Sequence, residues 1–445
     1  MPGLTAYAGA VLVIGAVLLT MASLLRIAGL KLGEFTIPGF FVIMYFVSAY
    51  VGCVLLLFGL DDYAVSLGVI DPNLVIKLFG FSSFGLLMIL AGIVFASRAL
   101  GASPPRAKRV VFVAPTRQQR WFFVGLFGCS CAVLVAYLSR VDEVALLVAL
   151  GGDPVGAALA RSNMGNAFSG SYWRYKLFFR YLMDLCALYF LADFVMRPGL
   201  RAGALAAFSL FVASFTAVMA IQKSPIIALF VMAFLVIVTT RDGRYWQPEL
   251  KYVAPVAVGM GALMYVVFMG ADDVMTGVRW FAGRVFSGQI IPAYFYLDLF
   301  PRNSGYLWGI SLPNPAGLFP FDPYPLTREV SRAMFPENAA SGVVGSAPTV
   351  FWAEMYVNFG PIAVIASSFW VGVMVFLVSH ILNRFPSSPS TIACTVFFAM
   401  HFRLLNGTGL SALFFDQVAL AVILVFFVSL VLGRKDERIF RYSKH

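Results

Sequence analysis

Long apolar runs recur along the whole chain. Each approaches the roughly 20 residues that a helix needs to cross a bilayer. The runs are continuously apolar rather than alternating, so they predict helices and exclude a porin-like barrel. About eleven spans are expected, with ends uncertain by several residues. They lie near residues 5–25, 37–59, 75–97, 121–139, 173–196, 202–221, 225–240, 252–270, 349–381, 391–405 and 410–433. The predicted fold is an all-α polytopic membrane protein, one integral membrane domain over residues 1–445.

The segment from Thr349 to Leu382 is too long for one straight span. We expect a short re-entrant or interfacial helix that ends at Gly360. Pro361 then opens the true span, because its fixed φ suits the first turn of a helix.

Composition supports the membrane class: 60% of the residues are hydrophobic and 12% are charged, against about 25% charged in soluble domains. A soluble enzyme, a disordered regulator and a secreted disulfide scaffold are excluded. The five cysteines lie inside apolar runs without metal-like spacing, as small buried hydrophobic residues do. The first run lacks a basic n-region, so we expect it to remain as a helix rather than be cleaved.

The distribution of Lys and Arg predicts the orientation. The loop 98–120 contains basic residues and no acid, and the C-terminal tail is also basic, so both are expected in the cytoplasm. The loop 60–73 contains aspartates and no base and is expected outside. Alternation then places the N-terminus and two long loops, 140–172 and 271–348, on the external face. The net charge of +11 therefore reports topology, not nucleic-acid binding.

Several bases break this rule by lying on the external side. Those before the large loop are Arg161, Arg174, Lys176, Arg180 and Lys223; those within 271–348 are Arg279, Arg284, Arg302, Arg328 and Arg332. The large loop contains no lysine, and arginine binds phosphate bidentately where lysine is a point charge. One interpretation is a set of ordinary salt bridges with the loop acids Asp272, Asp273, Asp298, Asp322 and Glu329. The other, favoured for the whole set, is an anion site.

Charges inside apolar spans are functional candidates because they are expensive to bury. Glu354 is one of these, with Asn358 on its face one turn later. Arg403 and Asp416 lie near the outer ends of the last two helices. Structural alternatives are an Arg403–Asp416 ion pair and a partnership of Glu354 with an external arginine. The aromatic, Pro-rich stretch 292–325 suits sugar rings, although membrane interfaces also collect aromatics.

These features resemble the Wzy-type polymerases of O-antigen and oligosaccharide repeat units. The resemblance rests on Arg279-x4-Arg284, Tyr294–Pro301, Gly305–Gly309 and, most specifically, Glu354-Met-Tyr356-Val-Asn358-Phe-Gly360. The Arg-x10-Gly pattern of some members is not matched at Arg161 or Arg279.

The resemblance implies a GT-C-like fold and a metal-independent glycosyltransferase. Glycan on undecaprenyl diphosphate is the donor, and a lipid-linked repeat unit is the acceptor. Glu354 is the preferred base, with Asp298 and Asp416 as alternatives. Diphosphate contacts are assigned to Arg161, Lys176, Arg180, Arg279, Arg284 and Arg403. Glycan contacts are assigned to Tyr294, Tyr296, Tyr306, Trp308, Tyr356 and Asn358.

The expected location is the bacterial inner membrane, with the active site facing the periplasm. Expected partners are lipid-linked glycans, membrane lipids, a chain-length regulator and a repeat-unit flippase, with no cofactor and no nucleic acid. Three alternatives stay open. An O-antigen ligase is expected to have a histidine in its large external loop, and 271–348 has none. A peptidoglycan polymerase of the shape, elongation, division and sporulation type should show motifs that are not visible. A transporter or flippase should have broken helices near mid-membrane.

Overall fold

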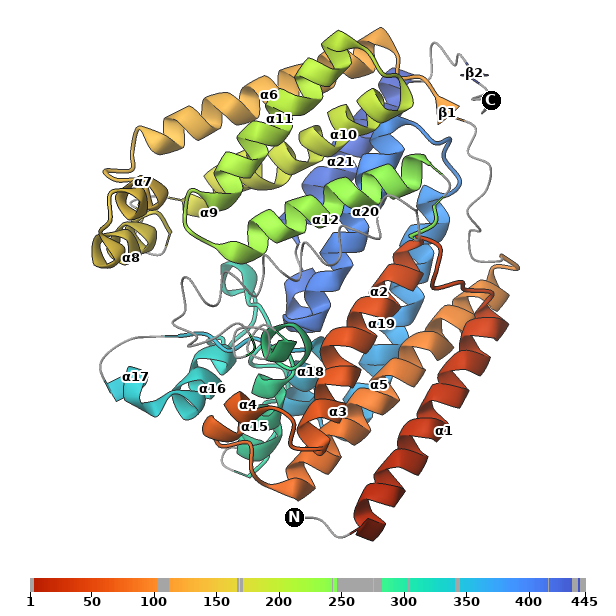
Figure 1. Ribbon diagram of the computed structural model, residues 1–445, viewed down its shortest axis with the longest axis vertical. Helices are drawn as coiled ribbons and strands as arrows, with labels where there is room; N and C mark the ends of the chain where they lie inside the picture. Colours follow the sequence, from red (N-terminus) through yellow and green to blue (C-terminus); the bar gives the residue numbers. More distant parts are fainter. Residues whose placement is uncertain are drawn as a thin grey trace. The chain divides into compact units, whose positions relative to one another are not determined.

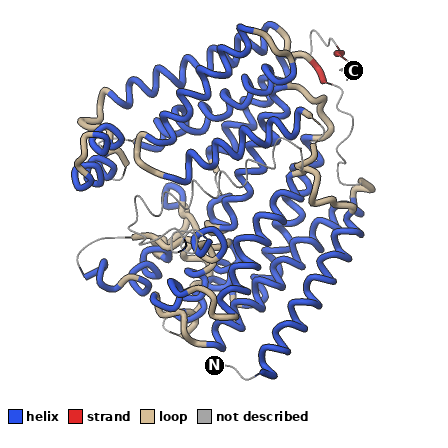
Figure 2. The backbone as a smooth tube through the Cα atoms, viewed as in Figure 1, coloured by secondary structure: helices blue, strands red, loops and turns tan. Residues whose placement is uncertain are grey.

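The structure is a computed structural model that describes residues 4–102, 112–165, 168, 171–241, 243–245, 275, 282–302, 305–340, 345–414, 416–433 and 439–440. Helices dominate this part of the chain, and its only strands are the short antiparallel pair β1 (Phe112–Val113) and β2 (Ile439–Phe440) (Figures 1 and 2). Seven described segments are long and apolar enough to cross a membrane: Gly9–Ala28, Ile37–Leu57, Pro72–Ala99, Arg117–Leu138, Leu200–Val218, Pro361–Leu382 and Leu410–Gly433. The all-α polytopic class is thus confirmed, while the count of about eleven spans stays a prediction.

Three further predicted spans are helical but shorter or more charged. The span 173–196 is a continuous helix made of α9 (Tyr172–Lys176), a π-helical segment (Leu177–Leu182) and α10 (Met183–Met196). The spans 225–240 and 391–405 correspond to α12 (Lys223–Thr240) and α20 (Pro389–Arg403). The predicted span 252–270 lies outside the described residues.

The chain forms two compact units. Unit 1 contains Met1–Arg106, Tyr245–His380 and His401–Phe415, and unit 2 contains the remaining residues.

Unit 1 is built on a bundle of long helices. Its helices are α1 (Leu4–Ala28), α2 (Ile37–Tyr45), α3 (Gly52–Leu57), α5 (Pro72–Ala99) and α19 (Pro361–Leu382), with a π-helical segment (Phe46–Val51) joining α2 to α3. Helices α5 and α19 approach each other at glycines. A Cβ on Gly92 would lie 2.1 Å from the Phe369 carbonyl oxygen, and one on Gly372 would lie 2.1 Å from that of Ile89. Small residues permit such close backbone packing in membrane helices.

The predicted break before α19 is confirmed. Helix α18 (Phe351–Phe359) ends at Gly360, and α19 begins at Pro361. Gly360 has φ +78° and ψ −167°, a conformation essentially restricted to glycine. The glycine turns the chain and the proline starts the next helix, so one long apolar run becomes two helices.

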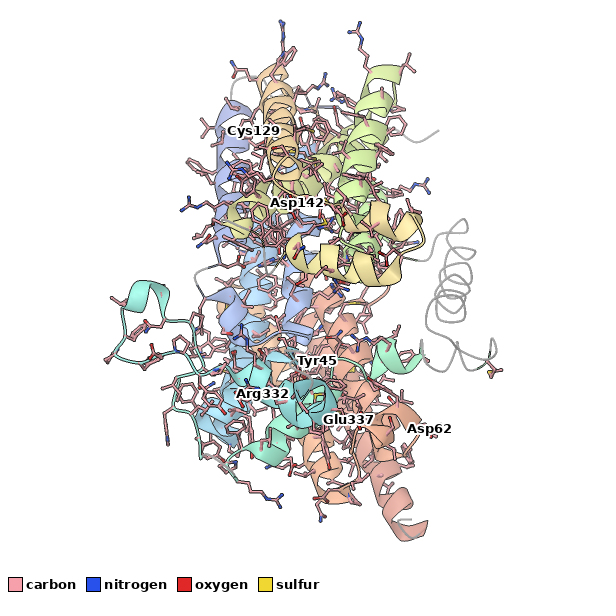
Figure 3. The ribbon with its side chains drawn as sticks, turned by 90° about the vertical axis from the view of Figure 1, so that its left-hand side faces the viewer. Tyr45, Asp62, Cys129, Asp142, Arg332 and Glu337 are labelled. Carbon is pink, nitrogen blue, oxygen red and sulfur yellow. The ribbon has the colours of Figure 1, made fainter. Side chains whose placement is uncertain are left out.

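Segments predicted to be external meet at one end of unit 1 (Figure 1). This end contains α4 (Asp62–Ser66), α15 (Ile291–Leu299), α16 (Leu326–Met334) and α17 (Pro336–Ala340); Arg332 of α16 and Glu337 of α17 are labelled in Figure 3. The Asp71 N–H donates to the Tyr294 hydroxyl at 3.1 Å, and the Ser287 hydroxyl donates to the Asp61 carboxylate. The loops 60–73 and 271–348 therefore share a side, as the charge pattern predicts.

Unit 2 packs largely through aromatic residues. It contains α6 (Arg117–Leu138), α7 (Ala145–Leu150), α8 (Pro154–Asn163), α9, α10, α11 (Leu200–Val218), α12 and α21 (Gln417–Gly433). Phe123 stacks on Tyr189 with ring centroids 3.7 Å apart. The Gln119 amide donates to the Ser429 carbonyl at 2.8 Å and ties α6 to α21.

Candidate functional site

The Glu354 carboxylate lies buried on α18, with 7% of the residue exposed. It accepts hydrogen bonds from the Ser411 N–H (2.8 Å) and the Ser411 hydroxyl (2.6 Å). A Cβ on Gly409 would lie 2.4 Å from the Glu354 carboxyl carbon. Only a glycine at 409 lets this segment fold over the carboxylate, so the Gly409–Ser411 backbone is built around Glu354.

Two opposing effects act on the Glu354 carboxyl. Burial raises its pKa, and the hydrogen bonds from Ser411 and the Leu410 backbone oppose that rise. No described Arg, Lys or His forms an ion pair with it; the described ion pairs all involve other acids. Partnership with a described external arginine is therefore wrong. Its charge is met by neutral dipoles.

Asn358 lies one turn after Glu354, and its amide donates to the Glu354 carbonyl at 2.8 Å. The same amide group donates to the Ser311 hydroxyl (2.7 Å) and accepts from the Gly309 N–H (2.9 Å). The side chain is completely buried. Its amide oxygen and nitrogen are therefore occupied by partners inside the protein. In the structure Asn358 anchors the 305–311 loop, and its contact with glycan stays a prediction.

That loop displays an aromatic side chain. The Trp308 N–H donates to the Asn358 carbonyl at 2.9 Å, Trp308 has φ +50°, and 74% of the residue is exposed. A positive φ is a genuine outlier for a bulky residue. The loop therefore holds Trp308 outward against both backbone strain and the hydrophobic effect.

A lysine that the sequence analysis missed faces the other side of α18. The Lys77 ammonium of α5 donates to the Tyr356 hydroxyl at 2.6 Å and lies 4.7 Å from the Tyr356 ring centroid. Tyr306 packs edge-on against Tyr356 (6.0 Å) and against Trp308 (6.5 Å). The signal was present, because Lys77 is the single charge in the apolar run 75–97.

The remaining predicted glycan residues are buried. Tyr294 and Tyr296 belong to α15, are 3% and 2% exposed, and are not in a loop as predicted. The Tyr296 hydroxyl donates to the Ala347 carbonyl at 3.3 Å. Tyr356 is 1% exposed. Pro292 opens α15, and the helix packs apolar neighbours around both tyrosines. Among the predicted set, Tyr306 and Trp308 are the ones that reach the surface.

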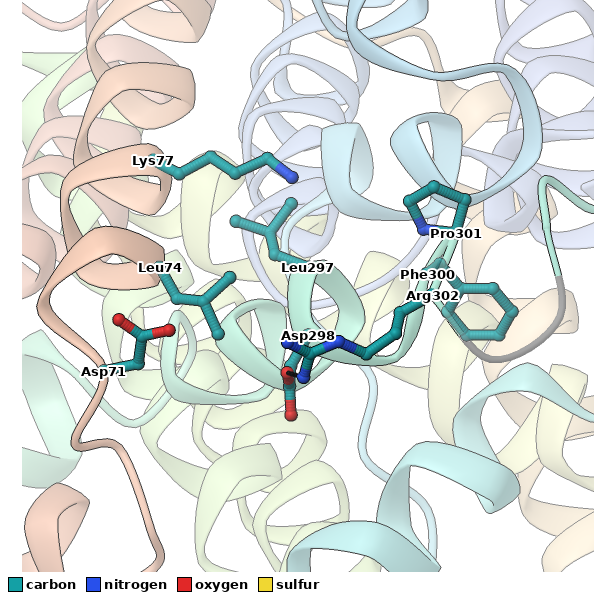
Figure 4. A pocket seen from close by; sticks show the side chains of 8 residues that line it. All are labelled: Asp71, Leu74, Lys77, Leu297, Asp298, Phe300, Pro301 and Arg302. Carbon is teal, nitrogen blue, oxygen red and sulfur yellow. Dashed lines mark hydrogen bonds and ion pairs between the residues drawn. The ribbon is translucent and has the colours of Figure 1, made fainter.

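A cavity of about 260 Å³ lies between α5 and the end of α15 (Figure 4). Its polar lining residues are Asp71, Lys77, Asp298 and Arg302. The Arg302 guanidinium lies 3.1 Å from the Asp298 carboxylate. The salt-bridge interpretation therefore holds for this arginine, and also for Arg332, which pairs with Glu329.

The predicted diphosphate ligands are divided between the two units. Arg161, Lys176 and Arg180 belong to unit 2, as does Asp416, whereas Arg284 and Arg403 belong to unit 1. Arg279 lies outside the described residues. Arg403 and Asp416, the predicted ion pair, belong to different units. The Asp416 carboxylate accepts the Val418 N–H (2.9 Å) at the start of α21.

The environments of these bases also differ. Arg180 is buried, and its Nη2 lies 3.2 Å from the Asp184 carboxylate and donates to the Pro225 carbonyl (2.9 Å), while its Nη1 is buried without a hydrogen-bond partner. Lys176 lies 5.8 Å from the Tyr172 and Tyr181 ring centroids. Arg161 and Arg284 are exposed. The Arg403 Nε is buried without a hydrogen-bond partner. Arg403 and Arg284 are the described candidates that belong to the same unit as Glu354.

No family model, curated protein or solved structure matches this chain. Among the described residues, no group of three or more His, Cys, Asp or Glu side chains could hold a metal ion.

Proposed function

We propose that this chain is a GT-C-like, metal-independent glycosyltransferase that polymerises undecaprenyl-diphosphate-linked repeat units on the periplasmic face of the bacterial inner membrane. The observation that supports the proposal most is the organisation of α18. Three alternate residues of this helix have different tasks. Glu354 carries a buried carboxylate, Tyr356 contacts a lysine, and Asn358 anchors an exposed aromatic loop. Those groups suit proton transfer, anion contact and sugar contact.

In the proposed reaction an acceptor hydroxyl attacks the anomeric carbon of the donor sugar. The new glycosidic bond forms as the bond to undecaprenyl diphosphate breaks, and the leaving diphosphate carries away the electron pair. The hydroxyl proton passes to the Glu354 carboxylate, which must be ionised to accept it. Arg403, Arg284 and Arg279 are proposed to stabilise the developing diphosphate charge, which is the usual role of cations at such a centre.

Deleting the gene and resolving the surface glycan on a gel tests the proposal. We expect one repeat unit attached to its acceptor, because polymerisation is lost while ligation continues. A glycan-free acceptor would instead indicate a ligase or a flippase. Complementation with wild type should restore the ladder and Glu354→Gln should not. Glu337→Gln is the matched control, since Glu337 is an exposed carboxylate in the same unit.

A further inference from the structure

The cavity between α5 and α15 has balanced charge. It presents two carboxylates, Asp71 and Asp298, and two cations, Lys77 and Arg302. Figure 4 shows Asp71, the residue that caps the start of α5, and Lys77 of α5 on one side, with Asp298 and Arg302 on the other. The rest of the lining is apolar and includes Leu74, Leu297 and Phe300. Because each side carries one carboxylate and one cation, the lining has no net positive charge to attract a dianionic phosphate.

Lys77 has spare hydrogen-bonding capacity. No described carboxylate forms an ion pair with it. An ammonium has three N–H donors, and the described contact with the Tyr356 hydroxyl uses one of them. Asp71 and Asp298 supply acceptors, although the Asp71 side chain also accepts the Asn73 N–H at 2.9 Å. Donors and acceptors around apolar walls match a ring that carries several hydroxyl groups.

The size of the cavity favours one ring. Its volume of about 260 Å³ lies just below the roughly 300–1,000 Å³ of pockets for drug-sized ligands. A single sugar unit fits that limit, and a longer glycan must continue outside.

A row of packed aromatic side chains connects the cavity lining with the protein surface. Lys77 contacts Tyr356, Tyr356 packs against Tyr306, and Tyr306 packs against Trp308. This row leads from the cavity to a tryptophan that is 74% exposed. Strained residues that the surrounding structure holds in place are frequent in ligand-binding sites.

We infer that the cavity binds one neutral sugar ring through Asp71, Lys77, Asp298 and Arg302, and that Trp308 stacks on the adjoining sugar. The inference rests on the proposed function for the source of the sugar. The binding itself is independent of turnover.

The test is a binding titration of the full-length chain in lipid nanodiscs, with saturation-transfer NMR as the measurement of binding. The probes are D-glucose, D-galactose, D-mannose, L-rhamnose, N-acetyl-D-glucosamine and maltose, with pyrophosphate as the anionic comparator. We expect at least one neutral sugar to bind in the millimolar range, about −4 kcal/mol, without competition from pyrophosphate. Asp298→Asn and Lys77→Met should each weaken binding at least tenfold.

Two variants test the details. Glu329→Gln is the matched control because it breaks the other arginine pair of this end of unit 1, Arg332–Glu329, and it should bind like wild type. Trp308→Ala should weaken binding of a two-ring probe several-fold and leave a one-ring probe unchanged.

Three results would overturn the inference. The first is no sugar binding up to about 50 mM, which is roughly 2 kcal/mol weaker than the expected range. The others are displacement of the sugar by pyrophosphate in a Lys77-dependent way, and a loss of sugar binding in Glu329→Gln equal to that in Asp298→Asn. Failure of the enzymatic proposal is separable. Sugar binding together with a normal polymer ladder in the deletion strain would retain the subsite and reject the polymerase.

Discussion

The two units treat their buried charges differently. In unit 2, the buried acids lie against cations: Asp184 against Arg180 (3.2 Å), and Asp193 against Arg197 and Arg120. In unit 1, Glu354 is met by Ser411 and Lys77 by Tyr356, both neutral partners. Neither forms an ion pair with a described residue.

This difference separates two roles for a charge in an apolar protein. A paired charge is neutralised and its partner uses most of its hydrogen bonds, so it contributes mainly to structure. A charge met by neutral dipoles keeps its net charge for a ligand or a proton, at a cost in stability. We therefore expect variants in unit 2 to alter stability first, and variants in unit 1 to alter activity first.

The largest effect on stability is expected from Asp184→Asn. Removing one partner of a buried pair leaves an unneutralised charge and costs about 3–5 kcal/mol. Chemical unfolding of the purified protein in detergent measures this loss. Asp142→Asn is the control, since Asp142 is exposed in the same unit (Figure 3). Equal stability of the two variants would contradict a structural role for the Arg180–Asp184 pair.

Glu354→Gln is expected to lower polymerisation at least a hundredfold, the usual contribution of a general base. Its unfolding free energy should change by no more than about 1 kcal/mol, because no ion pair is broken and one acceptor oxygen remains for Ser411. In vitro polymerisation of a lipid-linked repeat unit measures the first quantity, and chemical unfolding the second. If Glu354→Gln polymerises normally while Asp298→Asn or Asp416→Asn does not, the base belongs to that residue.

Much of the fold was predictable because the bilayer imposes one strong rule on sequence. Continuous apolar runs predicted the described spans. The Gly360-Pro361 pair predicted the break, because glycine accepts a positive φ and proline fixes φ at a value that suits the first turn of a helix. The loop prediction failed at Tyr294 and Tyr296, because an aromatic, Pro-containing stretch is equally compatible with a short buried helix. Tertiary packing decides between them.

The candidate site was less predictable, because its contacts join distant segments. Ser411 lies 57 residues from Glu354, and Lys77 lies 279 residues from Tyr356. No local pattern reports such pairs. A single lysine near the end of an apolar run also resembles one that extends to the interface, which is why Lys77 was overlooked.

A smaller effect is expected from Arg284→Lys and Arg279→Lys. Lysine keeps the charge but lacks the planar fork that binds phosphate bidentately, so polymerisation should fall about tenfold in each, or roughly 1.4 kcal/mol of transition-state stabilisation. The control is Arg332→Lys, because Arg332 pairs with Glu329. Wild-type polymerisation in both variants would show that these arginines do not bind the leaving group.

The smallest effect is a shift of the pH profile, and it tests the Ser411 contacts of Glu354. Burial raises the pKa of this carboxyl, and hydrogen bonds from Ser411 and Leu410 lower it. A base acts only when ionised, so activity should rise with pH through the raised pKa. Ser411→Ala removes the side-chain donor but keeps the backbone N–H, which should move the acid limb to higher pH and leave the plateau rate nearly unchanged. An unmoved limb would assign it to another group.

The same pKa also predicts how stability depends on pH. Because the folded-state pKa of Glu354 lies above its unfolded value, the folded chain binds the extra proton between the two values. The stabilising contribution is complete below the unfolded pKa and is lost as pH rises through the folded pKa. The thermal stability of wild type should therefore fall as pH rises across this window, and Glu354→Gln should lack that fall. If both proteins respond to pH identically, the folded-state pKa of Glu354 is not raised, and the acid limb of the activity profile belongs to another group.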